Sequence, residues 1–141
     1  MAKLEVTIDV IIHATEDIEK FYEGFSEMFG LEKDIFSVSQ VIGHFDNPII
    51  TIRAKITKKE ALGFLAKFLE KISENQKNEI IEHIEERTEN STLYIRFDKQ
   101  MFIQGKIEFR EKEAIRLKIH TPVYNKKDTV KVFSEIFQKV I

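Results

Sequence analysis

Residues 4–13, LEVTIDVIIH, alternate apolar side chains with mostly polar ones and decide how the rest of the chain is interpreted. A period of two residues is the repeat of a β-strand, and the apolar positions from Leu4 to Ile12 would all face one side. The sequence therefore predicts an N-terminal strand that is buried on one face. Such a strand needs helices to cover that face and further strands to pair with its edges.

A helix pattern follows this strand directly. Thr15 is expected to cap it, with two acids at 16–17 in the first turn, where the positive end of the helix dipole favours them. Phe, Tyr, Ile and Met then recur at helical spacing, and Gly30 is expected to end the helix.

Three more helices are predicted from their starting signals. Thr57-Lys58-Lys59-Glu60 and Ser73-Glu74-Asn75-Gln76 both have the form of a capping box, and the second opens a very acidic stretch. A terminal helix is expected after the cap residue Asn125.

The remaining strands complete the predicted fold class. Period-two patterns bounded by turn formers predict strands at residues 34–42, 49–56, 92–98, 101–109 and 114–120. The element order β-α-β-β-α-α-β-β-β-α favours an α+β fold with a single antiparallel (mixed) sheet and helices mainly on one face. At 141 residues we expect one domain, 1–141.

Composition excludes several classes of protein. The chain has no Cys, which removes disulfides, thiolate metal sites and cysteine nucleophiles. It has no stretch of about 20 apolar residues that could cross a membrane, and its first residues lack the pattern of a signal peptide. We therefore expect a cytoplasmic protein.

Charge is distributed unevenly along the chain. The net charge is −2, but residues 91–141 hold 11 Lys and Arg against 6 Asp and Glu, whereas residues 1–90 hold 11 against 18. Such asymmetry is a hint of a polyanionic partner.

The second face of the sheet is where these cations would gather. If helices cover one face, alternate residues of the late strands project from the other. Arg and Lys there could meet phosphates, and Tyr or Phe could stack on bases, as in surfaces that bind single-stranded RNA. The alternative is that these charges only solubilise an open sheet face.

Three motifs stand out beyond the packing pattern: HATED at 13–17, GHFDNPI at 43–49 and LYIRFDKQ at 93–100. In this order and spacing they resemble the archaeal RNA-binding protein family described as a predicted exosome subunit, and the similarity covers nearly the whole chain. The resemblance implies a fold similar to the large-subunit ribosomal protein five, RNA binding and association with the exosome.

Two departures from the family pattern concern possible contacts. Asp46 stands where the family usually has Gly, which puts a carboxylate into a turn that would otherwise approach phosphate closely. MFIQG follows Gln100, where a more polar or small residue and a Tyr are expected.

The candidate RNA-binding residues come from the motifs and the open sheet face. They are His13, His44, Asn47, Arg53, Lys55, Tyr94, Arg96, Lys99, Lys106, Arg110, Arg116 and Lys118. Each has a structural alternative, such as a hydrogen bond within its own turn for His13 or an ion pair with a helix Glu for Arg96.

We expect no enzyme, no cofactor and no metal site. The four His residues are widely separated, and the spacing of Glu79 and His83 offers at most half of a metal site. A different class of function remains open: an adaptor for protein partners or a homodimer, docking through acidic helices or an open sheet edge. RNA binding that weakens steeply with salt would separate the two.

Overall fold

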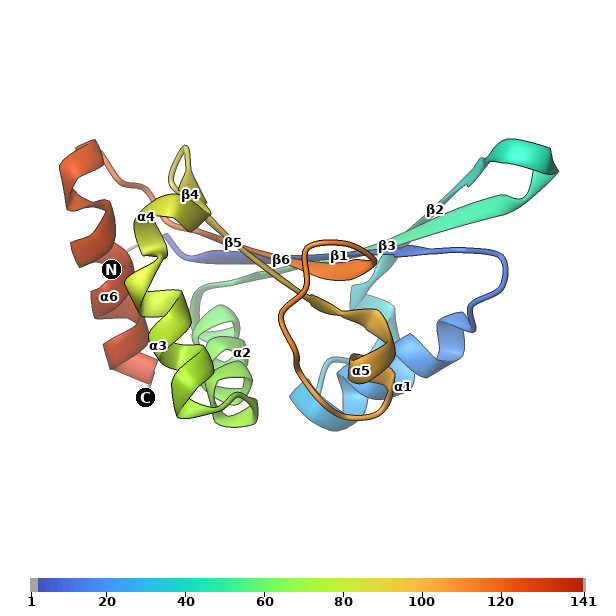
Figure 1. The fold of residues 1–141 in the computed structure, drawn as a ribbon, viewed down its shortest axis with the longest axis horizontal. Coiled ribbons are helices and arrows are strands. Elements are labelled where there is room, and N and C mark those ends of the chain that lie inside the picture. The colour runs from blue at the N-terminus through green and yellow to red at the C-terminus, as the bar shows by residue number, and fades with distance from the viewer. Residues whose placement is uncertain (1–2, 141) are drawn as a thin grey trace. The chain divides into compact units, whose positions relative to one another are not determined.

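The computed structural model describes residues 3–140, apart from the side chain of His44. Its elements are β1 (Glu5–Ile12), α1 (Ile18–Phe29), β2 (Ser37–Ile42), β3 (Pro48–Thr57), α2 (Lys58–Lys71), α3 (Glu74–Glu82), α4 (Ile84–Arg87), β4 (Thr88–Glu89), β5 (Thr92–Asp98), α5 (Lys99–Ile103), β6 (Ala114–His120) and α6 (Thr129–Val140), with short 3-10 turns at Lys33–Ile35, His44–Asp46 and Lys126–Asp128. Over this part of the chain the strands form one six-stranded sheet in the order β2-β3-β1-β6-β5-β4 (Figure 1). The predicted α+β fold with an antiparallel sheet is confirmed.

The chain divides into two compact units. Unit 1 contains residues 3–6, 56–95 and 118–140 of the described chain, and unit 2 contains residues 7–55 and 96–117. The expectation of a single domain over 1–141 stays a prediction. Over the described residues, no helix is long and apolar enough to span a bilayer.

Unit 2 has an aromatic core beneath one face of its strand segments. Helix α1 lies beside α5 on that face (Figure 1). Phe25 packs on Phe102 and Phe36, with ring centroids 4.6 and 4.9 Å apart. The helix ends at Gly30 as predicted, in the left-handed conformation. Its cap is Asp17, whose carboxylate accepts from Glu19 N, so the assignment of the cap to Thr15 was wrong by two residues.

Residues 101–109 do not form the predicted strand. Asp98 accepts from Met101 N at 2.8 Å and starts the short helix α5, which turns Phe102 into the core. An ideal Cβ on Gly24 would lie 2.7 Å from the Phe102 ring, so α1 has a glycine where that ring comes closest. After α5 the chain returns to β5 through the isolated bridge between Phe97 and Phe109, before β6 pairs beside β5 in the sheet.

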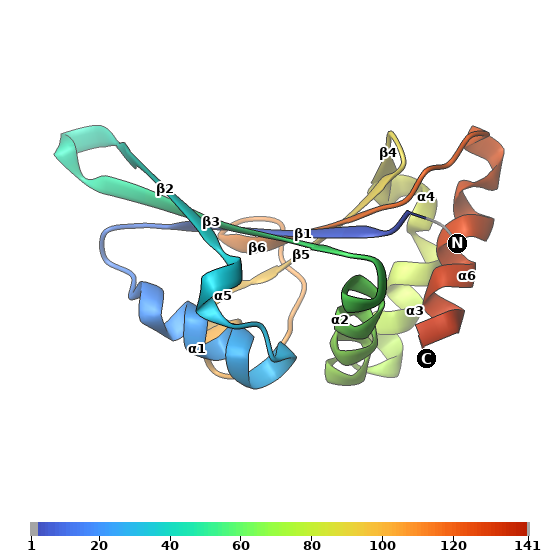
Figure 2. The same ribbon diagram turned by 180° about the vertical axis from the view of Figure 1, so that it is seen from behind.

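In unit 1, helices α2, α3 and α6 cover one face of the strand segments (Figure 2). Ser73 forms the predicted capping box with Gln76. Thr57 precedes α2 but makes no capping hydrogen bond through its side chain, so the capping box predicted there is absent. Asn125 caps the 3-10 turn before α6 rather than α6 itself. The short strand β4 was not predicted.

Strand β2 is the exposed edge of unit 2. It begins at Ser37, later than predicted, because Lys33–Ile35 form a 3-10 turn. It pairs with β3 in antiparallel register from Ser37 with Arg53 to Ile42 with Pro48, and all six of its residues are exposed.

Candidate nucleic-acid interface

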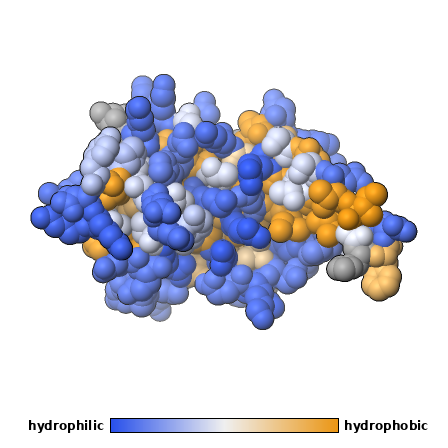
Figure 3. All heavy atoms as spheres, turned by 90° about the horizontal axis from the view of Figure 1, so that it is seen from above, coloured by the Kyte–Doolittle hydropathy of each residue, from blue (hydrophilic) through white to orange (hydrophobic). Residues whose placement is uncertain are grey.

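Four cationic side chains occupy alternate positions on the unit 2 strands, opposite the buried residues. Arg53 and Lys55 on β3 are exposed, and Arg116 on β6 is exposed. Arg96 on β5 is half-buried, and all four have buried neighbours in the chain. The side chains of this strand face gather in a largely hydrophilic surface, which gives way to a hydrophobic patch over the hairpin of β2 and β3 (Figure 3).

Acidic partners orient two of these cations. Arg53 pairs through Nε with Asp9, whose carboxylate holds the pKa of the guanidinium above its ordinary value. Arg96 pairs with the exposed Glu111 at 3.1 Å. Among the described residues, Arg116 has no ion-pair partner. The face therefore carries less net positive charge than a count of its Arg and Lys residues predicts.

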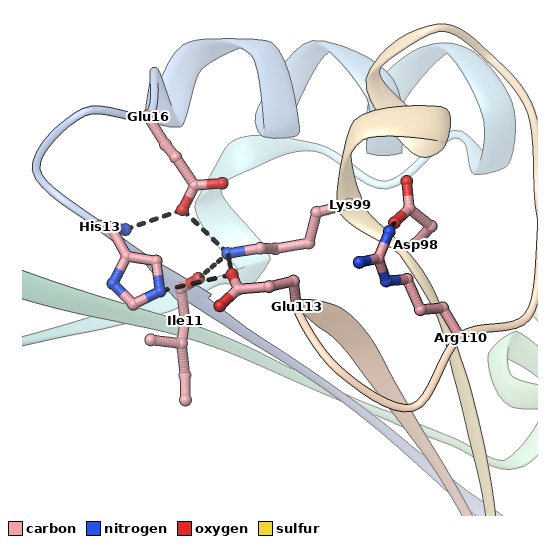
Figure 4. Close-up of polar contacts among 7 residues, drawn as sticks. All are labelled: Ile11, His13, Glu16, Asp98, Lys99, Arg110 and Glu113. Atoms are coloured by element: carbon pink, nitrogen blue, oxygen red, sulfur yellow. Dashed lines mark hydrogen bonds and ion pairs between the residues drawn. The ribbon is translucent and has the colours of Figure 1, made fainter.

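Lys99 is buried, and this corrects the expectation that it reaches a phosphate. Its side chain is 4% exposed, and its Nζ donates to Ile11 O and to Glu16 Oε1, both at 2.8 Å (Figure 4). Glu113 lies 3.5 Å from the same ammonium. Glu16 also accepts from His13 N at 2.9 Å. Lys99 therefore links the 13–17 motif to the 93–100 motif from the inside.

The pKa of Glu16 reflects this enclosure. Burial alone would raise the pKa of the carboxyl, but the His13 N–H and the Lys99 ammonium lower it and outweigh burial. The carboxylate is thus the stable form, and the ion pair persists at neutral pH.

Two hollows open beside His13 in unit 2. One, of about 440 Å³, is lined by Ile11, His13, Arg96, Lys99, Glu111, Glu113, Ala114 and Arg116. The other, of about 290 Å³, lies between the loop after β1 and the turn before β3. It is lined by His13, Ala14, Thr15, Gly43, Phe45, Asn47, Pro48 and Ile49. His13 is exposed, lines both hollows and lies 3.6 Å from Glu113.

The turn between β2 and β3 is closed by a hydrogen bond from Gly43 N to Asn47 O at 2.8 Å. Phe45 and Asp46 both have φ of 60°, in the left-handed region. Asn47 is exposed beside the smaller hollow, and the side chain of His44 lies outside the described residues. Phe45 was not among the predicted site residues, and the sequence has no signal for its backbone conformation.

The remaining predicted residues are dispersed. Lys106 and Arg110 are exposed in the loop between α5 and β6 rather than on a strand, and Arg110 pairs with Asp98 at 3.1 Å (Figure 4). Tyr94 and Lys118 belong to unit 1 and are half-buried. Unit 2 therefore holds most of the predicted set, but not as one continuous strand face.

The family model described as RNA binding matches residues 5–121. The chain belongs to this family. It is 35% identical to RNA-binding protein PAB1135 of Pyrococcus abyssi, covering 92% of this chain and 90% of that protein. Crystal structures of similar proteins include AF2318 from Archaeoglobus fulgidus, with 28% identity, 94% and 97% coverage and a TM-score of 0.79. The DUF54 protein Mth689 from Methanothermobacter thermautotrophicus has 26% identity, 97% and 99% coverage and a TM-score of 0.74.

In this member of the RNA-binding family, much of two motifs is structural. Asp17 caps α1, Asp98 caps α5, and Glu16 and Lys99 form the buried pair. His13 and the turn at 43–49 are the motif parts that border hollows. Among the described residues, no group of three or more His, Asp or Glu is placed to hold a metal ion.

Proposed function

We propose that this protein is a non-catalytic RNA-binding accessory protein, and that unit 2 carries its RNA contacts. Membership in a family described as RNA binding and the name of the Pyrococcus relative support RNA as the ligand. The single observation that supports the location is the set of exposed or half-exposed guanidinium groups on the unit 2 strands, beside the hollows at His13.

The ion pairs on this face leave the guanidinium groups usable. Arg53 keeps 59% of its side chain exposed although Asp9 holds its Nε, so the group is oriented with much of its surface open to solvent. A guanidinium has five N–H donors, which lets it bind a carboxylate and a phosphate oxygen together. The Arg96–Glu111 pair is exposed, and such pairs contribute only about 0–1 kcal/mol, so a phosphate can replace Glu111 at little cost.

The non-catalytic part of the proposal rests on how the titratable groups near His13 are used. Lys99 and Glu16 satisfy each other, a backbone carbonyl and a backbone N–H. A general acid or base needs to exchange its proton with substrate. Groups that are engaged in this way position the loop instead.

Association with the RNA-degrading exosome is the finer part of the proposal. It comes from the resemblance of the three motifs to the family described as a predicted exosome subunit. The association can be tested by purifying the tagged protein before and after ribonuclease treatment and looking for exosome subunits that co-purify. Recovery only before ribonuclease treatment would mean that RNA bridges the two.

Salt titration of RNA binding tests the main proposal. For single strands, log K falls with log salt by about 0.7 for each phosphate contact. Arg116→Gln should weaken binding to an unstructured RNA and reduce this slope by roughly 0.7. Lys131→Gln on α6, also exposed, is the matched control and should change neither quantity. Equal slopes for wild type and Arg116→Gln would remove this residue from the interface.

Crosslinking gives an independent location. Ultraviolet crosslinks to bound RNA should map to peptides that contain residues 43–49, 96 and 110–116. Crosslinks confined to unit 1 helices would contradict the proposed face.

The second candidate is a protein-interaction adaptor. The exposed edge strand β2, with Val38, Val41 and Ile42 open to solvent, favours it. Absence of RNA binding at low salt, together with ribonuclease-resistant recovery of exosome subunits, would support this candidate over RNA binding.

A further inference from the structure

Phe45 combines an exposed ring with a left-handed backbone, and both are energetically unfavourable for an aromatic residue. Its side chain is 95% exposed, and its backbone has φ 60° and ψ 30°. A left-handed conformation costs a non-glycine residue on the order of 1–2 kcal/mol. Exposure of a Phe ring also forgoes the gain from burying it. Strained residues of this kind cluster at ligand-binding sites, where a bound partner recovers the cost.

The turn around Phe45 is closed by a backbone hydrogen bond and a tightly placed glycine. Gly43 N donates to Asn47 O, and an ideal Cβ on Gly43 would lie 2.6 Å from Ile49 Cδ1. A larger residue at 43 would therefore require the Ile49 side chain to shift. Gly43 allows the two ends of the turn to close, and the ring of Phe45 is presented at the tip.

The smaller hollow next to this ring combines apolar and polar walls. Phe45, Pro48 and Ile49 are apolar lining residues, and Thr15 and Asn47 are polar ones. A nucleobase has the same combination, because its faces are apolar and its edge carries hydrogen-bond donors and acceptors. A flat apolar contact with another protein chain would have no use for the two polar residues.

His13 connects this hollow to the larger one. It lines both, and the larger is lined by Arg96, Lys99 and Arg116 against Glu111 and Glu113, an excess of one positive charge. A nucleotide joins a base to a phosphate, so a ligand of this kind would place its base on one side of His13 and its phosphate on the other. Charge thus favours a nucleotide over an apolar partner at this position.

We propose that the hollow formed by the loop at 13–15 and the turn at 43–49 receives one unpaired base of the bound RNA, stacked on Phe45. The inference rests on the proposed RNA-binding function and adds that Phe45 is a binding residue. It also requires the base to be unpaired, because a base inside a duplex cannot expose its face to a side chain.

A fluorescent reporter tests the contact directly. The chain contains no Trp, so Phe45→Trp introduces a single indole at the site. Oligoadenylate should quench its emission in step with binding. Inorganic polyphosphate, which has charge but no bases, should bind without quenching.

Removal of the ring gives the affinity test. Phe45→Asn keeps a residue that tolerates the left-handed conformation, so the turn is preserved while the ring is lost. Since base–aromatic stacking is worth about 1–3 kcal/mol, this variant should weaken oligoadenylate binding roughly 5- to 150-fold. Its affinity for polyphosphate should stay that of the wild type.

Each contrary outcome has its own meaning. Oligoadenylate binding with unchanged indole emission and an unchanged affinity of Phe45→Asn would overturn the base-stacking inference and leave the proposed function standing. Wild-type protein that binds neither oligoadenylate nor polyphosphate at low salt would overturn the proposed function as well. Indole emission that shifts with protein concentration without RNA, and a dimer that Phe45→Asn dissociates, would assign the ring to a second copy instead.

Discussion

Replacing Lys99 with Met should destabilise the fold strongly, although the residue carries a charge that the sequence assigns to the surface. Met has a similar length and no charge, so the change removes the ammonium with little change in volume. The ammonium donates to Ile11 O and Glu16 Oε1 at 2.8 Å each, and its side chain is 4% exposed. Both Ile11 O and Glu16 Oε1 therefore lose a hydrogen-bond donor in this variant.

The magnitude follows from what each partner loses. A buried carbonyl without its donor costs about 1–3 kcal/mol. Removing one member of a buried ion pair costs about 3–5 kcal/mol, because the other charge remains. Glu16 retains its hydrogen bond from His13 N and keeps 13% of its side chain exposed, which limits the penalty. We expect a total loss of about 4 kcal/mol in the free energy of unfolding, which is the sum of the low ends of the two ranges.

Guanidinium denaturation followed by far-ultraviolet circular dichroism measures this loss through the transition midpoint. Lys33→Met is the matched control, because Lys33 pairs with Glu19 at 3.2 Å but is 64% exposed. Exposed pairs contribute about 0–1 kcal/mol, so the control should lose about 1 kcal/mol or less, even with the nearby Tyr22 ring. Equal losses for the two variants would refute the reasoning, since burial would then not matter.

Three further predictions concern stability. Glu16→Gln should lower the free energy of unfolding most above pH 4.5. The difference from the wild type should shrink as pH falls through the lowered pKa of Glu16, because protonation then removes the charge from the wild type as well. Denaturation at several pH values measures this difference. Gly24→Ala should destabilise the fold by about 1–3 kcal/mol, because the added methyl group meets the Phe102 ring. Gly63→Ala has open space around it and should stabilise α2 by about 1 kcal/mol. Parallel thermal melts compare the two variants. Phe45→Asn should raise the free energy of unfolding by up to about 1 kcal/mol through relief of left-handed strain, while it weakens RNA binding; a wild-type midpoint would contradict the strain argument.

The sequence predicted the parts of the fold that depend on repeating patterns. The alternation at residues 4–13 became β1, the alternate residues Leu4, Val6, Ile8, Val10 and Ile12 are all buried, and Gly30 ended α1. These predictions worked because burial of one face repeats along an element, so several residues carry the same information.

Residues 101–109 were mispredicted as a strand. Their period-two pattern and their short distance from the preceding strand are local signals, whereas the structure there depends on a long-range contact. The strands predicted at 92–98 and 101–109 left only a short link between them, but Asp98 caps a helix there instead. Phe102 then packs against the aromatic residues of α1, nearly eighty residues earlier in the chain. No local pattern contains that contact.

The sequence predicted which cationic residues lie on the candidate site, but not how much net positive charge the site carries. Strand periodicity correctly placed Arg53, Arg96 and Arg116 opposite the buried residues. It could not show that Asp9 and Glu111 pair with two of them, since these acids come from other segments. Long-range ion pairs of this kind decide how much positive potential a face presents.

The motif residues therefore separate by physical role, and the separation has a consequence for mutants. The Lys99–Glu16 pair joins segments 83 residues apart and, through His13 N, fixes the loop that borders both hollows. Loss of that pair should weaken both folding and RNA binding, because the loop loses its position. Exposed residues such as Arg116 and Phe45 contribute little to the core, so their removal should weaken RNA binding while the fold stays at least as stable. A variant of the buried pair that bound RNA with full affinity would show that the loop at His13 takes no part in recognition.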